Sequence, residues 1–350
     1  ASNQNWMVSQ QSNGWMYFAN NKGLLEFDGT RWKTYPINNA KLRALYIGAD
    51  QRIYVGGLGQ FGYFEPDNSG RLIYHCLSTK INKREIGNIW NIHMVGECVY
   101  YQSDKSVFYY KGGKVYRINC PRGAVCSAYL NNHFYIVSNN GIESLLGNKF
   151  INVCNTSGIV PSRILKMLSF GDKILLVTSK DGLFIFDGKE IKPFSSPIND
   201  IVKNKQLFCA TISSKYLAVG TVQHGVYLYS LKDKRVEHIS IENGLQNKSI
   251  LSLLFDRDDN LWIGLDNGID CIHLDSSYFF LNSSKSLLGA GYSSIVYDSH
   301  LYFGTNQGIY FALMNFSPNE DIQLKAIEGS EGEIWSLNEV EGDLFGCGRN

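Results

Sequence analysis

The chain has 350 residues, a formal net charge of +1, 19% charged residues and 44% apolar residues. The near-neutral charge excludes the basic surface typical of nucleic-acid-binding domains, and the apolar fraction excludes an intrinsically disordered chain. No apolar run reaches the roughly 18 residues of a membrane-spanning helix, and the first residues lack a signal-peptide pattern. The 21 Tyr, 19 Phe and 34 Gly favour strands joined by tight turns.

A strand–turn–strand pattern recurs along the chain. Complete copies occupy residues 13–29, 131–147, 172–188, 214–230, 259–275 and 298–314, and degraded copies occupy 50–67 and 96–112. The glycine that opens the third strand of each copy gives the period; Ser106 replaces it in one copy, and the other copies have Gly23, Gly62, Gly141, Gly182, Gly225, Gly268 and Gly308. A period near 40 residues with strand composition predicts an all-β fold, a β-propeller of four-stranded blades.

The copy DNLWIGLDNGIDCIHLD at residues 259–275 predicts the anatomy of one blade. We expect an inner strand at 249–256, a second strand at 261–265, a third at 269–274 and an outer strand at 276–282. Trp262 and Gly264 lie in the second strand and Gly268 lies in the hairpin loop, so all three have an expected structural role in packing and turning. The segment Asp256–Asn260 has alternating oxygen ligands, but it lacks the glycine and the terminal glutamate of a calcium loop, and we expect a turn.

The repeat count predicts two domains. A seven-bladed ring would use residues 1–285, and residues 286–350 would form the first blades of a second, incomplete propeller; an eight-bladed ring is the alternative. A ninth copy, at residues 332–350, stops after its second strand. This predicts that the chain is part of a longer protein.

The sequence has no recognisable catalytic or cofactor motif. Gly56–Gly62 is rich in glycine but has no lysine and no following helix start, which excludes a phosphate-binding loop. The eight cysteines form no CxxC pair and no histidine has metal-ligand spacing, so we expect no metal and no cofactor. Cys120 and Cys126 are close enough in sequence for a disulfide. Carboxylates paired across a ring remain an alternative, but we expect a non-enzyme.

Candidate ligand-binding residues come from the loops that share one face of a propeller and from the aromatics near the inner strands. The expected ligand-binding set is Arg43, Trp90, Arg163, His224, Lys248 and Tyr292. Trp6, Trp90 and Trp335 occupy matching places at the start of inner strands. They either fill the space between blades or line the central opening, where an aromatic face could stack on a sugar ring.

The residues at this point carry a family resemblance. The stretch NLWIGLDNGID resembles the repeat of two-component regulator propellers. The opening QNWMVSQQSNGWMYFANNKGLLEFDGTRW and the stretch IYVGGLGQFGYFEPD resemble the first blades of sensor regions in Bacteroidetes regulators. The resemblance implies the N-terminal propeller of a periplasmic sensor region, anchored by a membrane span elsewhere in an inner-membrane protein that carries a kinase or helix-turn-helix output.

The resemblance, and not any motif in these residues, implies a function in ligand sensing. We expect a non-catalytic sensor propeller that responds to an oligosaccharide, controls polysaccharide-utilisation genes and forms a homodimer in the full-length protein. This segment is expected to bind no nucleic acid. The alternatives are a structural propeller that serves dimerisation, and a propeller glycosidase or lyase.

Overall fold

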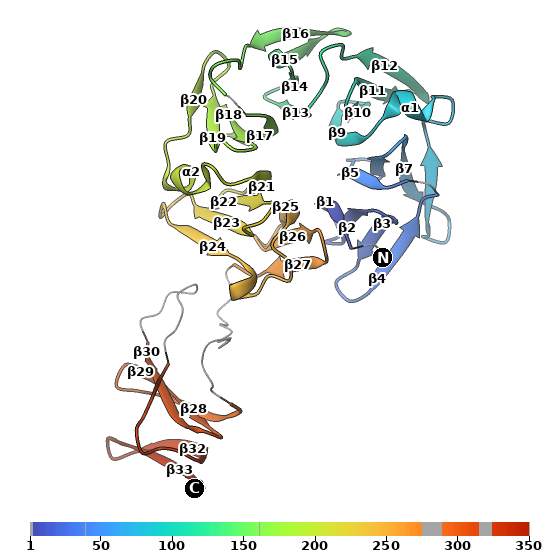
Figure 1. Ribbon diagram of the computed structural model, residues 1–350. Coiled ribbons are helices and arrows are strands. Elements are labelled where there is room, and N and C mark those ends of the chain that lie inside the picture. Colours follow the sequence, from blue (N-terminus) through green and yellow to red (C-terminus); the bar gives the residue numbers. More distant parts are fainter. Residues whose placement is uncertain (1–2, 39, 161, 275–288, 315–323, 350) are drawn as a thin grey trace. The chain divides into compact units, whose positions relative to one another are not determined.

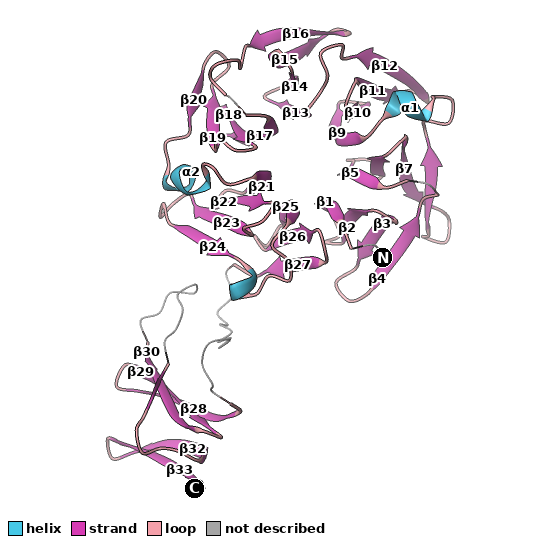
Figure 2. Cartoon of the chain, viewed as in Figure 1, coloured by secondary structure: helices cyan, strands magenta, loops and turns pink. Residues whose placement is uncertain are grey.

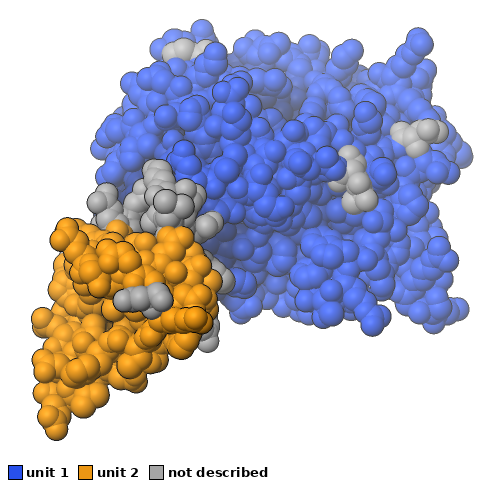
Figure 3. Space-filling model, turned by 60° about the horizontal axis from the view of Figure 1, so that its bottom comes forward, with its two compact units in different colours: residues 1–275 blue, residues 276–350 orange. Residues whose placement is uncertain are grey.

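The computed structural model describes residues 3–38, 40–160, 162–274, 289–314 and 324–349. The chain forms two compact units that divide between Asp275 and Ser276, earlier than the predicted boundary at 285 (Figure 3). That boundary and the predicted outer strand at 276–282 fall among residues 275–288, outside the described ranges. None of the helices in those ranges is long and apolar enough to cross a membrane.

The first unit consists of antiparallel sheets built from strands that follow one another in the chain, which confirms the all-β propeller class (Figure 1). Blades one to four comprise β1 (Asn5–Gln10), β2 (Met16–Asn20), β3 (Gly23–Phe27), β4 (Trp32–Pro36), β5 (Leu42–Ile47), β6 (Ile53–Gly57), β7 (Gln60–Pro66), β8 (Leu72–Cys76), β9 (Ile89–Val95), β10 (Cys98–Ser103), β11 (Ser106–Lys111), β12 (Lys114–Asn119), β13 (Cys126–Leu130), β14 (His133–Ser138), β15 (Gly141–Leu146) and β16 (Lys149–Cys154). Blades five to seven comprise β17 (Ile164–Phe170), β18 (Lys173–Thr178), β19 (Leu183–Phe186), β20 (Ile191–Pro193), β21 (Leu207–Ile212), β22 (Tyr216–Thr221), β23 (Val226–Ser230), β24 (Val236–Ile239), β25 (Ile250–Phe255), β26 (Leu261–Leu265) and β27 (Ile269–Ile272).

The first strands of these blades form a closed ring. Strands β1, β5, β9, β13, β17, β21 and β25 each contact the next in this order, and β25 contacts β1. Figure 1 shows them around the centre, with the later strands of each blade farther out. A sheet this small is unstable alone, so its apolar faces are buried between neighbours. Leu175 of blade five and Leu217 of blade six, both fully buried, belong to one such shared core.

Polar groups join the last blade to the first. The amide nitrogen of the buried Asn5 side chain donates to the backbone oxygen of Gly268 at 2.8 Å. Its backbone oxygen accepts from Ser252 Oγ at 3.0 Å, and its side-chain oxygen accepts from Asn20 Nδ2 at 2.9 Å. The equivalent place in other inner strands is apolar, as in Leu42, Ile89, Ile164, Leu207 and Ile250. The ring therefore closes through hydrogen bonds at a junction where the other blades use aliphatic packing.

The repeated glycines lie at the start of the third strands, where atoms of another segment come very close. Gly23 has φ +132°, and a Cβ there would lie 2.2 Å from the backbone oxygen of Tyr35. Gly225 has φ +69° and the same conflict, at 2.2 Å, with the backbone oxygen of Ile239. Both positions require glycine because positive φ and close backbone approach exclude other residues. Related conflicts, with a neighbouring backbone or side chain, occur at Gly62, Gly141, Gly182 and Gly308.

Two short helices that the sequence analysis missed connect blades. They are α1 (Lys83–Ile86), between blades two and three, and α2 (Pro197–Val202), between blades five and six (Figure 2). The Asn82 side chain caps α1 by accepting from Arg84 N, and Pro197 starts α2 at a position that needs no N–H donor. Each helix buries an isoleucine, Ile86 or Ile198. A 3-10 turn, η1 (Ile241–Asn243), precedes blade seven.

The second unit repeats the blade plan. One sheet contains β28 (Gly291–Tyr297), β29 (His300–Thr305), β30 (Gly308–Leu313) and β31 (Lys325–Ala326), and β32 (Glu333–Val340) pairs with β33 (Asp343–Arg349). These strands correspond to the predicted eighth copy and to the two strands of the ninth.

Candidate functional site

The inner strands share an irregularity near their first residues. In six of them one residue is skipped in the pairing with the second strand; these are Trp6, Arg43, Trp90, Leu165, Phe208 and Leu251. Val125 holds the equivalent place directly before β13. Such a β-bulge sets two residues opposite one and redirects the extra side chain. We call these seven positions the bulge residues.

Four bulge residues meet at the centre of the ring. The ring centroid of Trp6 lies 6.3 Å from that of Trp90 and 6.2 Å from that of Phe208, both in edge-on geometry. The guanidinium carbon of Arg43 lies 3.9 Å from the Trp6 ring centroid. In the ring of strands, β5 lies between β1 and β9, and β25 lies between β21 and β1, so these side chains meet across the centre. All four are partly exposed, and together we call them the central cluster.

Polar neighbours hold two members of the central cluster in place. Trp90 Nε1 donates to Asp104 Oδ1 at 2.6 Å, and Asp104 Oδ2 accepts from the backbone nitrogen of Asn88 at 3.3 Å. An Arg43 guanidinium nitrogen donates to Asn21 Oδ1 at 2.6 Å. Burial lowers the pKa of Arg43, but a guanidinium remains charged at neutral pH. The site therefore presents three aromatic rings and one fixed positive charge.

The indole nitrogen of Trp6 differs from that of Trp90. It is buried and has no hydrogen-bond partner among the residues that the structure describes. A buried N–H donor without an acceptor costs about 1–3 kcal/mol. Other atoms of the Trp6 side chain remain exposed, so the residue as a whole is partly buried.

The structure brings together only part of the predicted ligand-binding set. Arg43 and Trp90 meet through Trp6. Arg163 and Lys248 are exposed before β17 and β25, and His224 is exposed in the loop between β22 and β23. Those three side chains are solvated, and none of the contacts described for the central cluster involves them, because they belong to loops that precede or flank the bulges. Tyr292 is the bulge residue of β28 in the second unit, where it is 48% exposed.

Phe208 is a cluster member that sequence reasoning missed. The run LFCATI reads as an ordinary buried strand, and nothing in its alternation shows that one residue leaves the register. Trp6 was recognised as matching Trp90 and Trp335, and each of the three is skipped in its strand pairing at a β-bulge. The available signal was the aromatic residue in second place of β1, β9 and β21.

The acidic stretch before β26 is a turn, as predicted. Asp256 Oδ1 accepts from the backbone nitrogens of Asp258 and Asn260, each at 2.9 Å. Asp256 Oδ2 accepts from Trp262 Nε1 at 2.9 Å and from the Asn260 side chain at 3.0 Å. Both carboxylate oxygens are thus used within the turn, and Trp262 is fixed as a packing residue. Among the described residues no group of three or more His, Cys, Asp or Glu could hold a metal ion.

A backbone hydrogen bond holds the glycine-rich loop, and the cysteines are unpaired. The backbone nitrogen of Gly59 donates to the Gly87 oxygen at 2.8 Å, so the loop between β6 and β7 bonds to the segment before blade three. All eight cysteines are free thiols, Cys120 and Cys126 included. The disulfide considered for that pair is absent from the structure.

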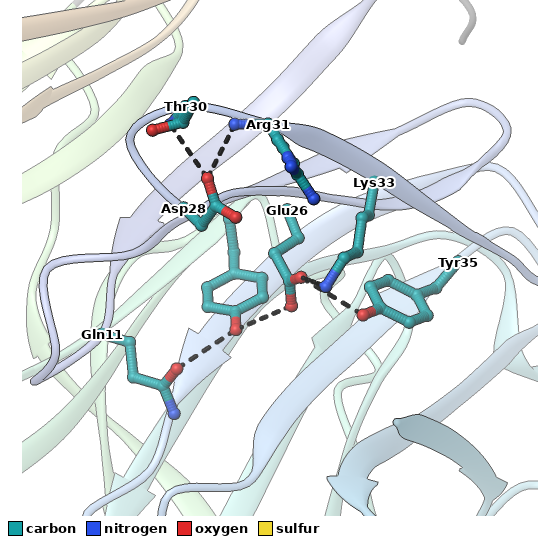
Figure 4. Close-up of polar contacts among 8 residues, drawn as sticks. Gln11, Glu26, Asp28, Thr30, Arg31, Lys33 and Tyr35 are labelled. Atoms are coloured by element: carbon teal, nitrogen blue, oxygen red, sulfur yellow. Dashed lines mark hydrogen bonds and ion pairs between the residues drawn. The ribbon is translucent and has the colours of Figure 1, made fainter. Parts of the chain in front are cut away.

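Among the described residues of the first unit two carboxylates are buried, and both lie on third strands. Glu26 on β3 is 2% exposed and accepts from the hydroxyls of Tyr17 at 3.1 Å and Tyr35 at 3.2 Å. Lys33 Nζ lies 3.3 Å from Glu26 Oε1, and Figure 4 shows the Lys33 and Tyr35 side chains directed toward the carboxylate. Glu143 on β15 accepts from the Ser138 hydroxyl. Glu143 Oε1 also lies 3.6 Å from a guanidinium nitrogen of Arg122, in the loop before β13, so both carboxylates have partners.

The Glu26 network predicts a pH dependence. Burial and then the negative charge of Glu26 raise the pKa of Tyr35 to about 12, and the same causes raise the pKa of Tyr17 further. Below pH 10 both tyrosines are neutral in the folded and unfolded chains. Above pH 10 the unfolded chain loses these protons while the folded chain keeps them, so stability must fall as pH rises. Urea unfolding of wild type and Tyr35→Phe at pH 9, 10 and 11 should show a smaller fall in the variant; equal falls would contradict this assignment.

One segment of the first unit matches a known family. Residues 244–267 match the family model described as two component regulator propeller. The matched residues run through β25 and β26 and include Trp262 and Gly264. No curated protein matches the sequence.

Solved structures resemble the chain in fold. An extracellular domain assigned to the hybrid two component system BT3049 of B. thetaiotaomicron matches with TM-score 0.70 and 17% identity, covering 99% of this chain and 50% of that chain. An extracellular domain assigned to the one component system BT4673 of B. thetaiotaomicron matches with TM-score 0.60 and 17% identity, covering 99% and 50%. Virginiamycin B lyase from Staphylococcus aureus matches with TM-score 0.61 and 12% identity, covering 76% and 93%. The chain thus spans about half the length of the B. thetaiotaomicron domains.

Proposed function

We propose that the chain is a non-catalytic sensor propeller of a signal-transduction regulator and that it binds an oligosaccharide at the central cluster. The observation that carries the proposal is the convergence of Trp6, Trp90, Phe208 and Arg43 from four separate blades, all partly exposed. Aromatic faces pack on the apolar faces of sugar rings, and a fixed cation donates to hydroxyl or acidic oxygens.

The proposed setting follows from the family and from the neighbours in fold. The structurally similar domains from B. thetaiotaomicron are described as extracellular parts of hybrid two component systems. By analogy this propeller lies in the periplasm, as part of a homodimeric inner-membrane regulator of polysaccharide-utilisation genes. Ligand binding would stabilise one arrangement of propellers or of dimer partners and so change the output of domains elsewhere in that protein.

Calorimetric titration of the chain with a panel of oligosaccharides tests the proposal. Trp90→Ala removes one aromatic face and the donor to Asp104, and we expect it to weaken the affinity for the best ligand at least about tenfold. Arg43→Ala should weaken binding by a similar factor. Trp32→Ala is the matched control, because Trp32 is 50% exposed on the outer strand β4 and stacks on Phe27. A comparable loss in Trp32→Ala, or binding unchanged in Trp90→Ala, would refute the central cluster as the site.

The same samples separate the alternatives. A structural propeller would bind none of the oligosaccharides while Arg43→Ala or Arg163→Ala altered the mass measured by light scattering. A propeller lyase or glycosidase would consume the ligand during the titration. We expect the recovered oligosaccharide to be chemically unchanged.

A further inference from the structure

The central cluster lies beside one set of loops of the first unit. Because neighbouring strands of a blade are antiparallel, the start of the first strand lies at the same edge as the end of the second and the start of the third. Arg43 bonds to Asn21, in the loop between β2 and β3. Trp90 bonds to Asp104, in the loop between β10 and β11. The cluster therefore shares its face of the ring with these loops and with the connections that lead into the inner strands.

We call these segments the cluster-side loops. Their described residues in the first unit are 3–4, 21–22, 37–38, 40–41, 58–59, 77–88, 104–105, 120–125, 139–140, 155–160, 162–163, 179–182, 194–206, 222–225, 240–249 and 266–268. Backbone hydrogen bonds join them from blade to blade: Asn204 N donates to the Lys180 oxygen at 2.8 Å, and Gly225 N donates to the Lys248 oxygen at 3.0 Å. They therefore form one continuous surface.

The cluster-side loops carry an excess of positive charge. They contain twelve lysine and arginine residues against six aspartate and glutamate residues. The loops at the other ends of the same strands, which join first to second and third to fourth strands, contain nine against eleven. The formal net charge of the whole chain is only +1. The positive charge of the first unit is therefore concentrated on the face that holds the central cluster.

Five of these cations lie along blades five to seven. They are Arg163, Lys180, Lys203, Lys205 and Lys248, and we call them the basic arc. Ser179 N donates to the Arg163 oxygen at 2.8 Å, and Val222 N donates to the Gln206 oxygen at 2.9 Å, which connects their segments in order around the ring. Lys205 is partly exposed and the other four are exposed.

The basic arc borders the central cluster. Lys205 precedes the cluster member Phe208 by three residues, and three residues of chain span at most about 11 Å. Arg163 precedes the bulge residue Leu165 by two residues, and Lys248 precedes the bulge residue Leu251 by three. An exposed charge acts over roughly 10 Å at 0.1 M salt, whichever way a flexible side chain points. The arc therefore sets the sign of the field at this side of the cluster.

Carboxylates of the chain do not neutralise the basic arc. No member takes part in an ion pair with another residue in the described ranges. Asp181, which follows Lys180, accepts instead from the backbone nitrogen of Ser162 at 2.7 Å. Asp266 accepts from the Gln4 side chain at 2.6 Å. A surface of one charge sign attracts ligands of the opposite sign and raises their association rate.

We propose that the oligosaccharide bound at the central cluster is acidic, with carboxylate or sulfate groups on successive sugars, and that the basic arc attracts those groups. The inference rests on the proposed function and deepens it, because it names the class of oligosaccharide. A single small anion would meet only part of an arc that extends over three blades. A linear acidic glycan brings several charges to the arc while one of its sugars packs on the aromatic rings.

Calorimetric titration with acidic and neutral tetrasaccharides tests the inference. The acidic probes are the tetramers of galacturonate and guluronate and a heparin tetrasaccharide, and the neutral probes are maltotetraose and mannotetraose. We expect at least one acidic probe to bind wild type more tightly than both neutral probes. This preference should shrink when sodium chloride is raised from about 50 to about 300 mM, because salt screens exposed charges.

Two triple variants separate the basic arc from net charge. Lys180→Gln combined with Lys203→Gln and Lys248→Gln should weaken the affinity for the acidic probe about tenfold and leave the affinity for neutral probes unchanged. All three lysines are exposed, so the variant should fold as wild type does.

The matched control combines Lys173→Gln, Lys189→Gln and Lys232→Gln. These exposed lysines belong to blades five and six and lie at the other ends of the strands. The control changes the net charge by the same amount, and it should bind the acidic probe as wild type does.

Equal affinity for acidic and neutral probes, or an equal loss in both triple variants, overturns the inference. If a neutral tetrasaccharide binds and Trp90→Ala weakens it, the proposed function stands without an acidic ligand. If the arc variant weakens an acidic probe but Trp90→Ala does not, the basic arc stands and the central cluster fails as the site. Sedimentation with phosphatidylglycerol vesicles covers the other polyanion. Vesicle binding that is lost in the arc variant, with no tetrasaccharide bound, would assign the face to lipid and overturn both proposals.

Discussion

Replacing Gly264 with alanine is expected to lower the free energy of unfolding of the first unit by about 3 kcal/mol. A Cβ at this position would lie 2.1 Å from Ser252 Oγ and 2.5 Å from the backbone oxygen of Asn5. The second obstacle belongs to the first blade, and its backbone is held by the bonds that close the ring. The conflict therefore opens the junction between blades seven and one, instead of merely displacing a flexible side chain.

Urea unfolding of paired variants tests which obstacle causes the loss of stability. Adding Ser252→Ala to Gly264→Ala should recover little stability, because the Asn5 carbonyl remains. At Gly56 the obstacles are side-chain atoms of Ile89, the nearest at 2.5 Å. There, Ile89→Val should relieve part of the cost of Gly56→Ala. Gly291→Ala, at a strand glycine with no atom within 4 Å of its Cβ, should be nearly neutral. Wild-type stability in Gly264→Ala would show that the closure tolerates displacement.

Replacing Glu26 with alanine is also expected to cost about 3 kcal/mol, because hydrogen bonds to a charged acceptor each contribute roughly 1.5–3 kcal/mol. The substitution removes the acceptor of the Tyr35 hydroxyl and one of the two acceptors of the buried Tyr17 hydroxyl, the other being Gln11 Oε1. Lys33 is 55% exposed and can return to water, so it adds little to the loss.

Two further variants test how large the loss of stability at Glu26 should be. Glu26→Gln keeps an acceptor oxygen and should lose about half as much stability as Glu26→Ala, as measured by urea unfolding. Glu190→Ala removes the partner of Lys192 in an ion pair whose side chains are 71% and 64% exposed, and it should change stability by less than about 0.5 kcal/mol. A cost for Glu26→Ala no larger than for Glu190→Ala would mean that the buried network is energetically neutral.

The blade architecture was predictable because a short local sequence pattern encodes each blade and recurs along the chain. Each strand pair and its turn lie within about twenty residues, so the copy at 259–275 predicted β26 and β27 closely. The turn at Asp256 was predictable because aspartate and asparagine bond to nearby backbone nitrogens. The short helices escaped prediction because α1 and α2 span only a few residues, too few for helical periodicity to appear.

The central cluster was only partly predictable. Trp90 and Arg43 stood out by residue type, but Phe208 lies in a run that has the pattern of an ordinary strand. A β-bulge leaves no mark on the alternation of apolar and polar residues, so sequence alone does not show which side chain turns inward. Arg163, His224 and Lys248 were chosen from loop position, and loop position does not fix where a solvated side chain points. The closing role of Asn5 depends on a contact between the two ends of the ring, which no local pattern encodes.

Hydrogen–deuterium exchange with and without the oligosaccharide found by calorimetry tests the central claim most directly. We predict slower exchange in the ligand complex at the amides near Trp6, Arg43, Trp90 and Phe208, where the inner strands begin. Exchange in the outer strands β4, β12 and β20 should be unchanged. Protection confined to the outer strands or to the second unit, with the starts of the inner strands unaffected, would contradict ligand binding at the centre of the ring.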